Sequence, residues 1–312
     1  MDRRRFNLSK DIAVTGKTFD SGALLAAVVA YCIWGFMPLF FRQLAGVPAI
    51  EIIAHRVIWA VPLLLVIMAF RTQLPEFWAA ITSFKTLRWM MLSAVLISVN
   101  WLVYVWAVNN GLILAASLGY YLNPLLNVLV ATVFLGEKLN RTQWVAVAIA
   151  TLAVVVLASG APETLWISLT LAASFCFYGV VRKFAPIGAI PGLALETTLL
   201  FPVALVAAFW FYAGSTPRGW GSDITTTCLL LAGGAITAVP LLLFATAARR
   251  MSYSVIGFIQ YIGPTIQFLL GIFLYNETLS NVRLISFLLI WTALAIFSWD
   301  AIQRIRTSKI SA

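Results

Sequence analysis

Long uncharged stretches alternate with short polar segments along almost the whole chain. No charged residue occurs in 21–41, 89–136, 142–162, 164–181, 224–248 or 251–276. A helix that crosses a bilayer needs about 20 predominantly apolar residues, so the longest stretch holds two helices that fold back at Asn109-Asn110-Gly111. The pattern predicts ten membrane-spanning helices, at about 21–41, 49–70, 88–109, 112–135, 142–159, 164–182, 190–213, 224–247, 253–275 and 283–303.

The two halves of the chain repeat one another at an offset of 140 positions. The matched pairs include Tyr121 and Tyr261, Pro124 and Pro264, and Glu137 and Glu277. Each copy holds five predicted helices, and because five is odd, the second copy enters the membrane from the opposite face. A duplicated apolar chain of this kind is typical of secondary transporters, in which two repeats move about a shared site. We therefore predict an all-α integral membrane protein with ten transmembrane helices in two inverted five-helix repeats.

Composition and charge agree with this prediction. The chain is 62% hydrophobic and 10% charged, with a mean hydropathy of +0.96, whereas a water-soluble domain needs far more charge on its surface. If the N-terminus lies inside, the inner segments carry seventeen Lys and Arg residues and the outer ones carry three, Arg42, Arg218 and Arg283. Because cytoplasmic loops carry the excess of Lys and Arg, both termini are expected in the cytoplasm. The net charge of +10 reflects topology, so no nucleic-acid partner is expected.

The predicted organisation has no large segment outside the membrane. It consists of an N-terminal tail at 1–20, a first repeat at 21–159, a second repeat at 164–303 and a C-terminal tail at 304–312. The first hydrophobic span is full length, which favours a retained helix over a cleaved signal peptide. The longest inner loop is expected at 71–87. The chain has no Walker-type glycine loop, so direct ATP drive is not expected.

Several polar and aromatic motifs match a known family. They are Trp34-Gly35 with Pro38, Ala54-His55-Arg56, Asn100-Trp101, the run 116–124, the run 244–250, Gly257-Phe258-Ile259-Gln260-Tyr261, Pro264-Thr265 and Ile290-Trp291. With these motifs the chain resembles the RarD group of EamA-type permeases in the drug/metabolite transporter superfamily, over nearly all of 21–303. The resemblance implies a ten-helix, multi-pass permease of the bacterial inner (plasma) membrane, in a family associated with drug or metabolite movement and with chloramphenicol sensitivity.

Charged residues inside the predicted spans are the first candidates for function, because one at the bilayer centre costs about 2.5–3.5 kcal/mol on insertion scales. Arg56 and Glu196 are repeat mates, so they are expected at similar depths on opposite sides of the midplane. They are either two charged gates or a substrate anchor with a proton carrier; the alternative is a tertiary lock or a snorkelling arginine. His55, the only histidine, either titrates near neutral pH or hydrogen-bonds a neighbouring carbonyl.

The fourth and ninth predicted helices each carry polar residues around a central proline. The polar residues that we expect to line a cavity are Tyr121, Asn123, Gln260 and Tyr261. Spacings of three and four place the polar residues of each helix along one broad face. Pro124 and Pro264 each remove a backbone donor and are predicted hinges. Matched broken helices favour a binding site at the midplane, with amide contacts between helices as the alternative.

Aromatic residues beside amides complete the set. Asn100 and Tyr104 lie one turn apart, while Trp34 and Tyr178 each precede a glycine. Such a cavity suits a flat or aromatic solute, although ordinary core packing would explain the same residues. The predicted substrate-binding residues are therefore Trp34, His55, Arg56, Asn100, Tyr104, Tyr121, Asn123, Tyr178, Glu196, Gln260 and Tyr261. Glu137 and Glu277 stand at span ends, where we expect them to shape turns by capping the next helix.

These features predict a secondary active transporter that moves a small organic metabolite or drug by alternating access, with Glu196 or His55 as candidates for proton coupling. The alternatives are a channel-like facilitator and a translocase for a lipid or lipid-linked substrate. An enzyme is not expected, since one histidine and scattered carboxylates form no catalytic set. No metal or cofactor is expected. The expected partners are the substrate and membrane lipids, and the helices at 142–159 and 283–303 suit a peripheral or homodimer contact because they lack polar interior residues.

Overall fold

The computed structural model describes residues 21–135, 139–214, 219–251, 256 and 259–310. These residues are mostly helical and contain no strand. The helices are α1 (Ser21–Arg42), α2 (Ala49–Phe70), α3 (Leu74–Thr82), α4 (Phe84–Asn109), α5 (Ile113–Leu135), α6 (Arg141–Gly160), α7 (Pro162–Phe184), α8 (Ala189–Ala213), α9 (Ile224–Arg250), α11 (Ile262–Leu269), the π-helix η1 (Leu270–Leu274) and α12 (Asn281–Ile310).

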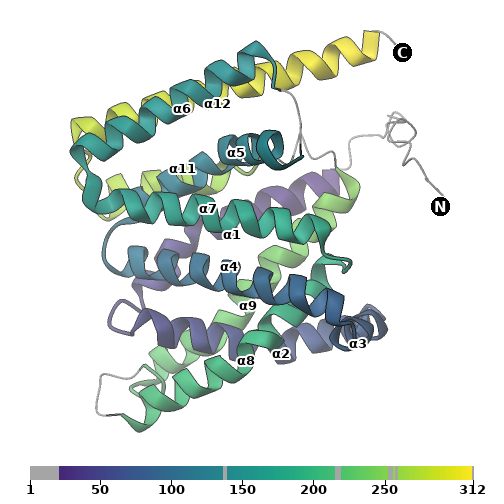
Figure 1. The fold of residues 1–312 in the computed structure, drawn as a ribbon. Helices are drawn as coiled ribbons and strands as arrows, with labels where there is room; N and C mark the ends of the chain where they lie inside the picture. The colour runs from purple at the N-terminus through teal and green to yellow at the C-terminus, as the bar shows by residue number, and fades with distance from the viewer. Residues whose placement is uncertain (1–20, 136–138, 215–218, 252–255, 257–258, 311–312) are drawn as a thin grey trace, which may run out of the picture.

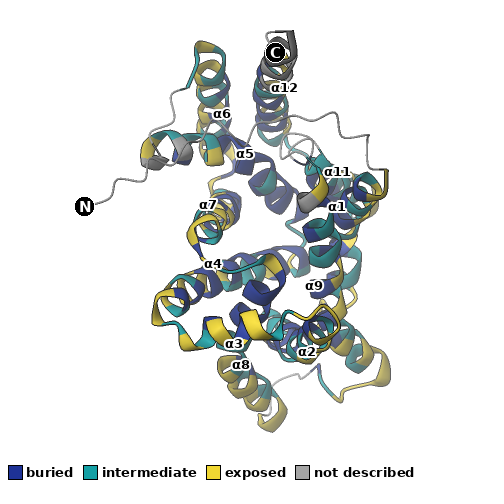
Figure 2. Ribbon diagram, turned by 90° about the vertical axis from the view of Figure 1, so that its right-hand side faces the viewer, coloured by how far each residue is buried: buried dark blue, intermediate teal, exposed yellow. Residues whose placement is uncertain are grey.

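The helices have the length and the surface of membrane spans. Within the described residues, nine are long and apolar enough to cross a membrane, and a shorter apolar helix covers Ile262–Leu274. Figure 2 shows that the outer face of α8 is largely exposed, and there Val206, Phe209 and Trp210 are each at least 70% exposed. An apolar face of this size is costly in water and favourable against lipid. The prediction of an all-α membrane protein with ten helices is confirmed.

The segment 71–87, which we expected to be a loop, contains the short helix α3. Pro75 stands in its first turn, where a missing N–H costs nothing. Phe77 and Ala80 are buried, whereas Trp78 between them is exposed. The charged residues around α3 hid this short amphipathic helix from a search for long uncharged stretches. Glu76 of α3 ties it to the bundle, because its Oε1 accepts a hydrogen bond of 2.6 Å from the Gly188 N–H.

The ninth and tenth spans differ from the prediction at their ends. Gln260 and Tyr261 lie in a turn, and α11 begins after them at Ile262. Pro264 lacks the N–H that would bond the carbonyl of Gln260, which accounts for the break at this point. Pro264 therefore stands in the first turn of α11, while Pro124 lies inside the continuous helix α5. The tenth span, α12, continues through the predicted tail to Ile310, because no Gly or Pro ends the helix.

The contacts between the helices agree with the expected symmetry between the two halves. The helix pairs α1 with α9 and α4 with α7 are in contact, and each pair is the counterpart of the other under the 140-position offset. The pairs α2 with α8, α5 with α11 and α6 with α12 are each their own counterpart and are also in contact. A two-fold relation between the halves produces this pattern. The division at 21–159 and 164–303 stays a prediction.

Figure 1 shows that α6 and α12 lie side by side at one edge of the bundle, away from α2 and α8. The start of α1 and the end of α12 lie at the same end of the bundle (Figure 1). We call this the inner end and the opposite one the outer end, following the orientation predicted from the sequence. With these names, α2 begins at the outer end and α8 begins at the inner end.

Candidate functional site

Arg56 is a buried cation held between aromatic rings. It lies seven residues after the start of α2, about 10 Å from the outer end of that helix, and it is 3% exposed. Its Cζ atom lies 4.8 Å from the Trp101 ring centroid and 5.2 Å from that of Phe41. Its Nε–H donates to Thr237 Oγ1 on α9 at 3.1 Å. Cation–π contact offsets part of the cost of burying a charge.

Glu196 occupies the matching position at the inner end. It lies seven residues after the start of α8 and is fully buried. Its Oε1 accepts a hydrogen bond from the Ser93 hydroxyl at 2.5 Å and lies 3.6 Å from Arg182 Nη1. Its Oε2 accepts a bond from the Tyr178 hydroxyl at 3.4 Å. This carboxylate therefore has three polar partners, one of them a cation.

The surroundings of the two charges are related by the repeat. Ser93, which touches Glu196, has Gly233 as its mate at the 140-position offset. A β-carbon added at Gly233 would lie 2.9 Å from Arg56 Cγ, so the backbone of α9 closely approaches the arginine stem. The predicted relation in depth thus has a structural counterpart. The chemistry of the two positions differs, because Glu196 is a carboxylate paired with Arg182, whereas Arg56 is a cation.

A continuous series of side chains connects the two charges. Tyr104 packs edge-on against Phe41 with ring centroids 6.0 Å apart, and against Tyr120 at 5.6 Å. The Tyr120 hydroxyl donates to Asn100 Oδ1 at 3.1 Å. Asn100 Nδ2 donates in turn to the Ser174 hydroxyl at 3.0 Å and to a backbone carbonyl on α7 at 3.1 Å.

The same series continues across α7 to the inner end. The Tyr120 ring lies 6.2 Å from the Phe175 ring, which lies 5.9 Å from the Tyr178 ring beside Glu196. We call these residues the central series: Arg56, Phe41, Tyr104, Tyr120, Asn100, Ser174, Phe175, Tyr178 and Glu196. Helices of both halves contribute to it. The predicted residues Arg56, Asn100, Tyr104, Tyr178 and Glu196 are therefore brought together.

Tyr121 and Tyr261 form a second group. Their rings stack with centroids 6.3 Å apart, and the Tyr121 hydroxyl is 2.6 Å from Thr265 Oγ1. Tyr121 also packs edge-on against Phe287 and Trp291 of α12. These two predicted residues meet across the interface of α5 with α11, in a core cluster separate from that of Tyr104.

The remaining predicted residues lie apart from the central series or at its edge. His55 stacks on the Trp220 ring at 4.7 Å, and within the described chain neither of its ring nitrogens has a hydrogen-bond partner. Trp34 packs with Tyr31 and Phe244 at 5.1 and 5.8 Å. Asn123 is 5% exposed. Gln260 lies half-buried in the turn before α11.

Sequence reasoning missed five residues that contact the two charges: Phe41, Ser93, Trp101, Arg182 and Thr237. Arg182 had a usable signal, since it precedes Glu196 by fourteen positions, as Arg42 precedes Arg56. Phe41 and Trp101 had none, because an aromatic residue in an apolar helix is ordinary. Their role depends on helices that are distant in sequence.

Glu277 has a structural role, as expected, but at another helix. Its two carboxylate oxygens accept hydrogen bonds from the N–H groups of Ile113 at 2.6 Å and Leu114 at 3.0 Å. It therefore caps α5 of the first half and not the next helix, α12, because the packed bundle brings that helix start to it. Glu137 lies outside the described residues.

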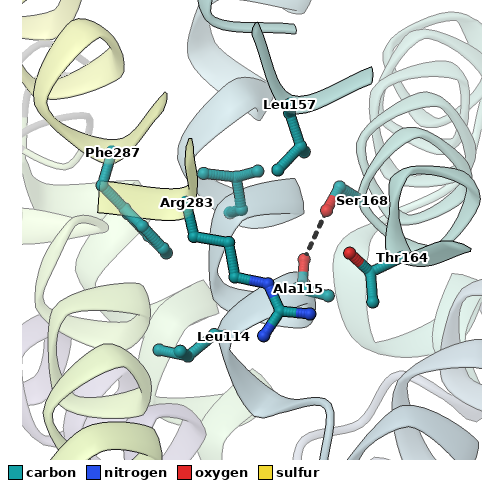
Figure 3. A pocket seen from close by; sticks show the side chains of 8 residues that line it. Leu114, Ala115, Leu157, Thr164, Ser168, Arg283 and Phe287 are labelled. Atoms are coloured by element: carbon teal, nitrogen blue, oxygen red, sulfur yellow. Dashed lines mark hydrogen bonds between the residues drawn. The ribbon is translucent and has the colours of Figure 1, made fainter. Parts of the chain in front are cut away.

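Two cavities lie outside the central series. One, of about 10 Å³, is lined by residues of α5, α6, α7 and α12 and has room for about one water. Figure 3 shows Arg283 reaching into it beside Ser168, whose hydroxyl donates to the carbonyl of Ala115 at 2.7 Å. The other, of about 320 Å³, is an open apolar groove on α1 and α9, lined by Val29, Cys32, Ile33, Phe36, Met37, Phe40 and Ile236.

Comparisons with known proteins agree with this architecture. A sequence model of the EamA-like transporter family matches residues 21–159. The chain is 43% identical to Protein RarD of Escherichia coli (strain K12) over 288 residues, which cover 92% of this chain and 97% of that protein. It is 43% identical to an uncharacterized transporter of Pseudomonas aeruginosa, covering 89% and 94% of the two chains.

More distant likenesses extend the same pattern. The chloramphenicol-sensitive protein RarD of Pseudomonas aeruginosa is 28% identical, over 91% of this chain and 95% of its own. A solved crystal structure superposes with a TM-score of 0.54 at 20% identity, covering 88% of this chain and 96% of the other, which shows a shared fold. The long, closely related matches decide the family: the chain belongs to the RarD family of EamA-type transporters, in the drug/metabolite transporter superfamily.

Proposed function

We propose that this protein is a secondary active transporter that moves a small organic metabolite or drug across the bacterial inner membrane by alternating access. The observation that carries the proposal is the central series, which joins two charges of opposite sign through residues of both halves. Arg56, Asn100, Tyr104 and Glu196 are each at most 4% exposed. Since these residues are closed off here, a substrate reaches them only when the helices separate at one end.

Polar contacts hold each end closed and must break in turn. At the outer end, the Glu51 carboxylate accepts hydrogen bonds of 2.9 Å from the N–H groups of Gly219 and Trp220. At the inner end, Arg182 pairs with Glu196 and donates through Nη2 to the carbonyl of Gly188 at 3.1 Å. The two sets involve different helices, so either can open while the other stays closed.

Glu196 is the proposed proton carrier. Protonation removes its charge and weakens its attraction to Arg182 at 3.6 Å. That change loosens the inner contacts while the neutral acid still bonds the Ser93 and Tyr178 hydroxyls. A proton bound to Glu196 is therefore linked to opening of the inner end. His55 is the alternative carrier, but it lies against Trp220 near the outer end.

The test is transport by purified protein in liposomes, after a metabolite panel has supplied a substrate. Glu196→Gln should abolish uphill transport driven by a proton gradient and leave substrate exchange intact. Glu163→Gln, a change of the same kind at a residue with a 67% exposed side chain, should leave both intact. Uphill transport by Glu196→Gln at the wild-type rate would reject the proton role, and absence of flux for every compound would reject the transport function.

The apolar groove favours a second candidate function, translocation of a lipid or lipid-linked substrate. It is open between α1 and α9 and lined by apolar side chains, as a lateral entry for acyl chains would be. A fluorescent-lipid flipping assay in the same vesicles separates the two functions. Faster flipping with no solute flux would favour the translocase.

The proposed setting has both termini in the cytoplasm, with the substrate and membrane lipids as partners. The edge position of α6 and α12 (Figure 1) favours a homodimer contact through this pair. Crosslinking of cysteines introduced at exposed positions of α6 tests the dimer, and reactivity of a C-terminal tag in sealed cells tests the orientation.

A further inference from the structure

We infer that the transported solute carries a carboxylate on a flat, aromatic scaffold, and that Arg56 binds this carboxylate with the help of the Tyr104 hydroxyl. The inference rests on the proposed transport function and adds a substrate class to it. It follows from a shortage of hydrogen-bond acceptors at the outer half of the central series.

The guanidinium of Arg56 has more donors than the protein satisfies. An arginine carries five N–H donors, and among the described residues only the Nε–H has a hydrogen-bond partner, Thr237 Oγ1. No carboxylate of the described chain lies within 4.0 Å of Arg56, whereas Arg182 at the other charge has Glu196. A buried cation without an anion is costly, so it is retained where a ligand supplies the anion.

Tyr104 adds an independent observation. Its hydroxyl is buried and has no hydrogen-bond partner within the described chain, although buried polar groups are nearly always bonded. Its ring packs against Phe41, which also lies under the Arg56 guanidinium. The unpartnered Tyr104 hydroxyl and the terminal nitrogens of Arg56, which have no hydrogen-bond acceptor in the described chain, thus both lie next to Phe41, and an oxyanion is the ligand that would bond to both.

The planar fork of arginine matches a carboxylate through two parallel hydrogen bonds. The Arg56 Cζ atom lies over the rings of Phe41 and Trp101, and its Nε–H is taken by Thr237, so the terminal nitrogens are left for the ligand. Tyr104 and Tyr120, with centroids 5.6 Å apart, supply the aromatic surface next to it. A flat group attached to the carboxylate stacks there.

Glu196 cannot take the same role, because its oxygens already accept bonds from Ser93 and Tyr178 and face Arg182. The anion therefore binds at the Arg56 end and is repelled from the Glu196 end until that acid is neutral. A purely structural role for Arg56 would rest on its hydrogen bond to Thr237, the close approach of Gly233 and the two ring contacts, and none of these gives the terminal nitrogens an acceptor.

The experiment measures binding to purified full-length protein in neutral detergent by isothermal calorimetry. The probes are matched compounds: aromatic acids (phenylacetate, cinnamate, indole-3-acetate), their primary amides, and hexanoate as an anion without a ring. We expect at least one aromatic acid to bind about tenfold more tightly than its amide and than hexanoate. Equal affinity of acids and amides, or no binding of any acid, would overturn the inference.

The variants locate the effect. Arg56→Gln should remove the preference for acid over amide, and Tyr104→Phe should reduce it about threefold. Arg71→Gln, the same substitution at an exposed residue at the end of α2, should retain it. Thr237→Val removes the structural tie and leaves the guanidinium, so it should keep the preference. Loss of preference in Thr237→Val but not in Tyr104→Phe would overturn anion binding. Arg56→Lys, with charge but no fork, serves if Arg56→Gln fails to fold.

Two further arms separate the source of the anion and the two proposals. Short-chain phosphatidylglycerol is tested beside the acids, and binding of this lipid alone, dependent on Arg56, would overturn a soluble carboxylate as the ligand. If the protein transports a compound in liposomes but binds acids no more tightly than their amides, the transport function is supported and only the inferred substrate class is rejected.

Discussion

Replacing Gly234 with alanine tests how closely α2 and α9 must approach to hold Arg56. A β-carbon at Gly234 would lie 2.5 Å from the backbone carbon of Trp59 and 2.6 Å from its carbonyl oxygen, whereas ordinary contact is 3.4–4 Å. Backbone atoms have no rotamer that moves them aside, so the two helices must separate by about 1 Å. Overpacking of this kind costs about 1–3 kcal/mol, and alanine recovers up to about 1 kcal/mol of helix propensity.

The expected net loss is about 1–2 kcal/mol, or a fall of about 2–6 °C in the apparent melting temperature of the detergent-purified protein. The same separation moves α9 away from Arg56 and loosens the packing of the central series around it, so transport should fall as well. Gly179→Ala is the matched control, because a β-carbon at that helical glycine of α7 meets nothing within 4 Å. The melting temperature of the Gly179→Ala protein should equal or exceed that of the wild type. A Gly234→Ala protein as stable and as active as the wild type would refute the close packing on which the Arg56 site depends.

The other predictions concern carboxylates at the outer end. Glu277→Ala leaves the N–H groups of Ile113 and Leu114 without acceptors and should cost about 1–3 kcal/mol in thermal melts, with Glu277→Gln closer to the wild type. Burial raises the pKa of Glu277 above its ordinary 4.5; the part of the folding stability that depends on its protonation is therefore complete below pH 4.5 and is lost as pH rises through the raised pKa. The melting temperature should change less with pH across that window for Glu277→Gln than for the wild type. An equal dependence on pH in the two proteins would contradict the raised pKa. Glu51→Ala removes the acceptor of three loop bonds near Trp220 and should cost about 2–4 kcal/mol, again measured by melting, whereas a wild-type melting temperature would show the loop is held by other contacts.

The spans could be predicted because the bilayer imposes a length and excludes charge. The same criterion missed α3, where Glu76 interrupts the apolar residues of a helix too short to cross. It also treated the ninth span as one unbroken helix across Gln260 and Tyr261, which lie in a turn, since hydropathy does not depend on the backbone hydrogen bond that Pro264 removes. Element boundaries thus followed local backbone chemistry wherever it departed from hydropathy.

The candidate site divides in the same way. Arg56 and Glu196 could be identified from sequence because a charged residue within a membrane span is energetically costly and is therefore usually functional. Tyr121 and Tyr261 were expected to share the site with them, but they stack on each other in a separate cluster, where Tyr121 packs against α12. Repeat symmetry predicted that these two tyrosines are counterparts, and it carried no information on which layer of the bundle they join.

What the sequence alone determined is the number of spans, the positions of the two charges along their helices and their relation through the repeat, because long apolar runs and a fixed membrane thickness leave little choice. The tertiary structure decided which partners the charges have. Glu196 gained a cation, and Arg56 gained two aromatic faces and no acid in the described chain. That difference arises where helices far apart in the chain cross within a few ångströms, and such crossings depend on side-chain packing that no local pattern records.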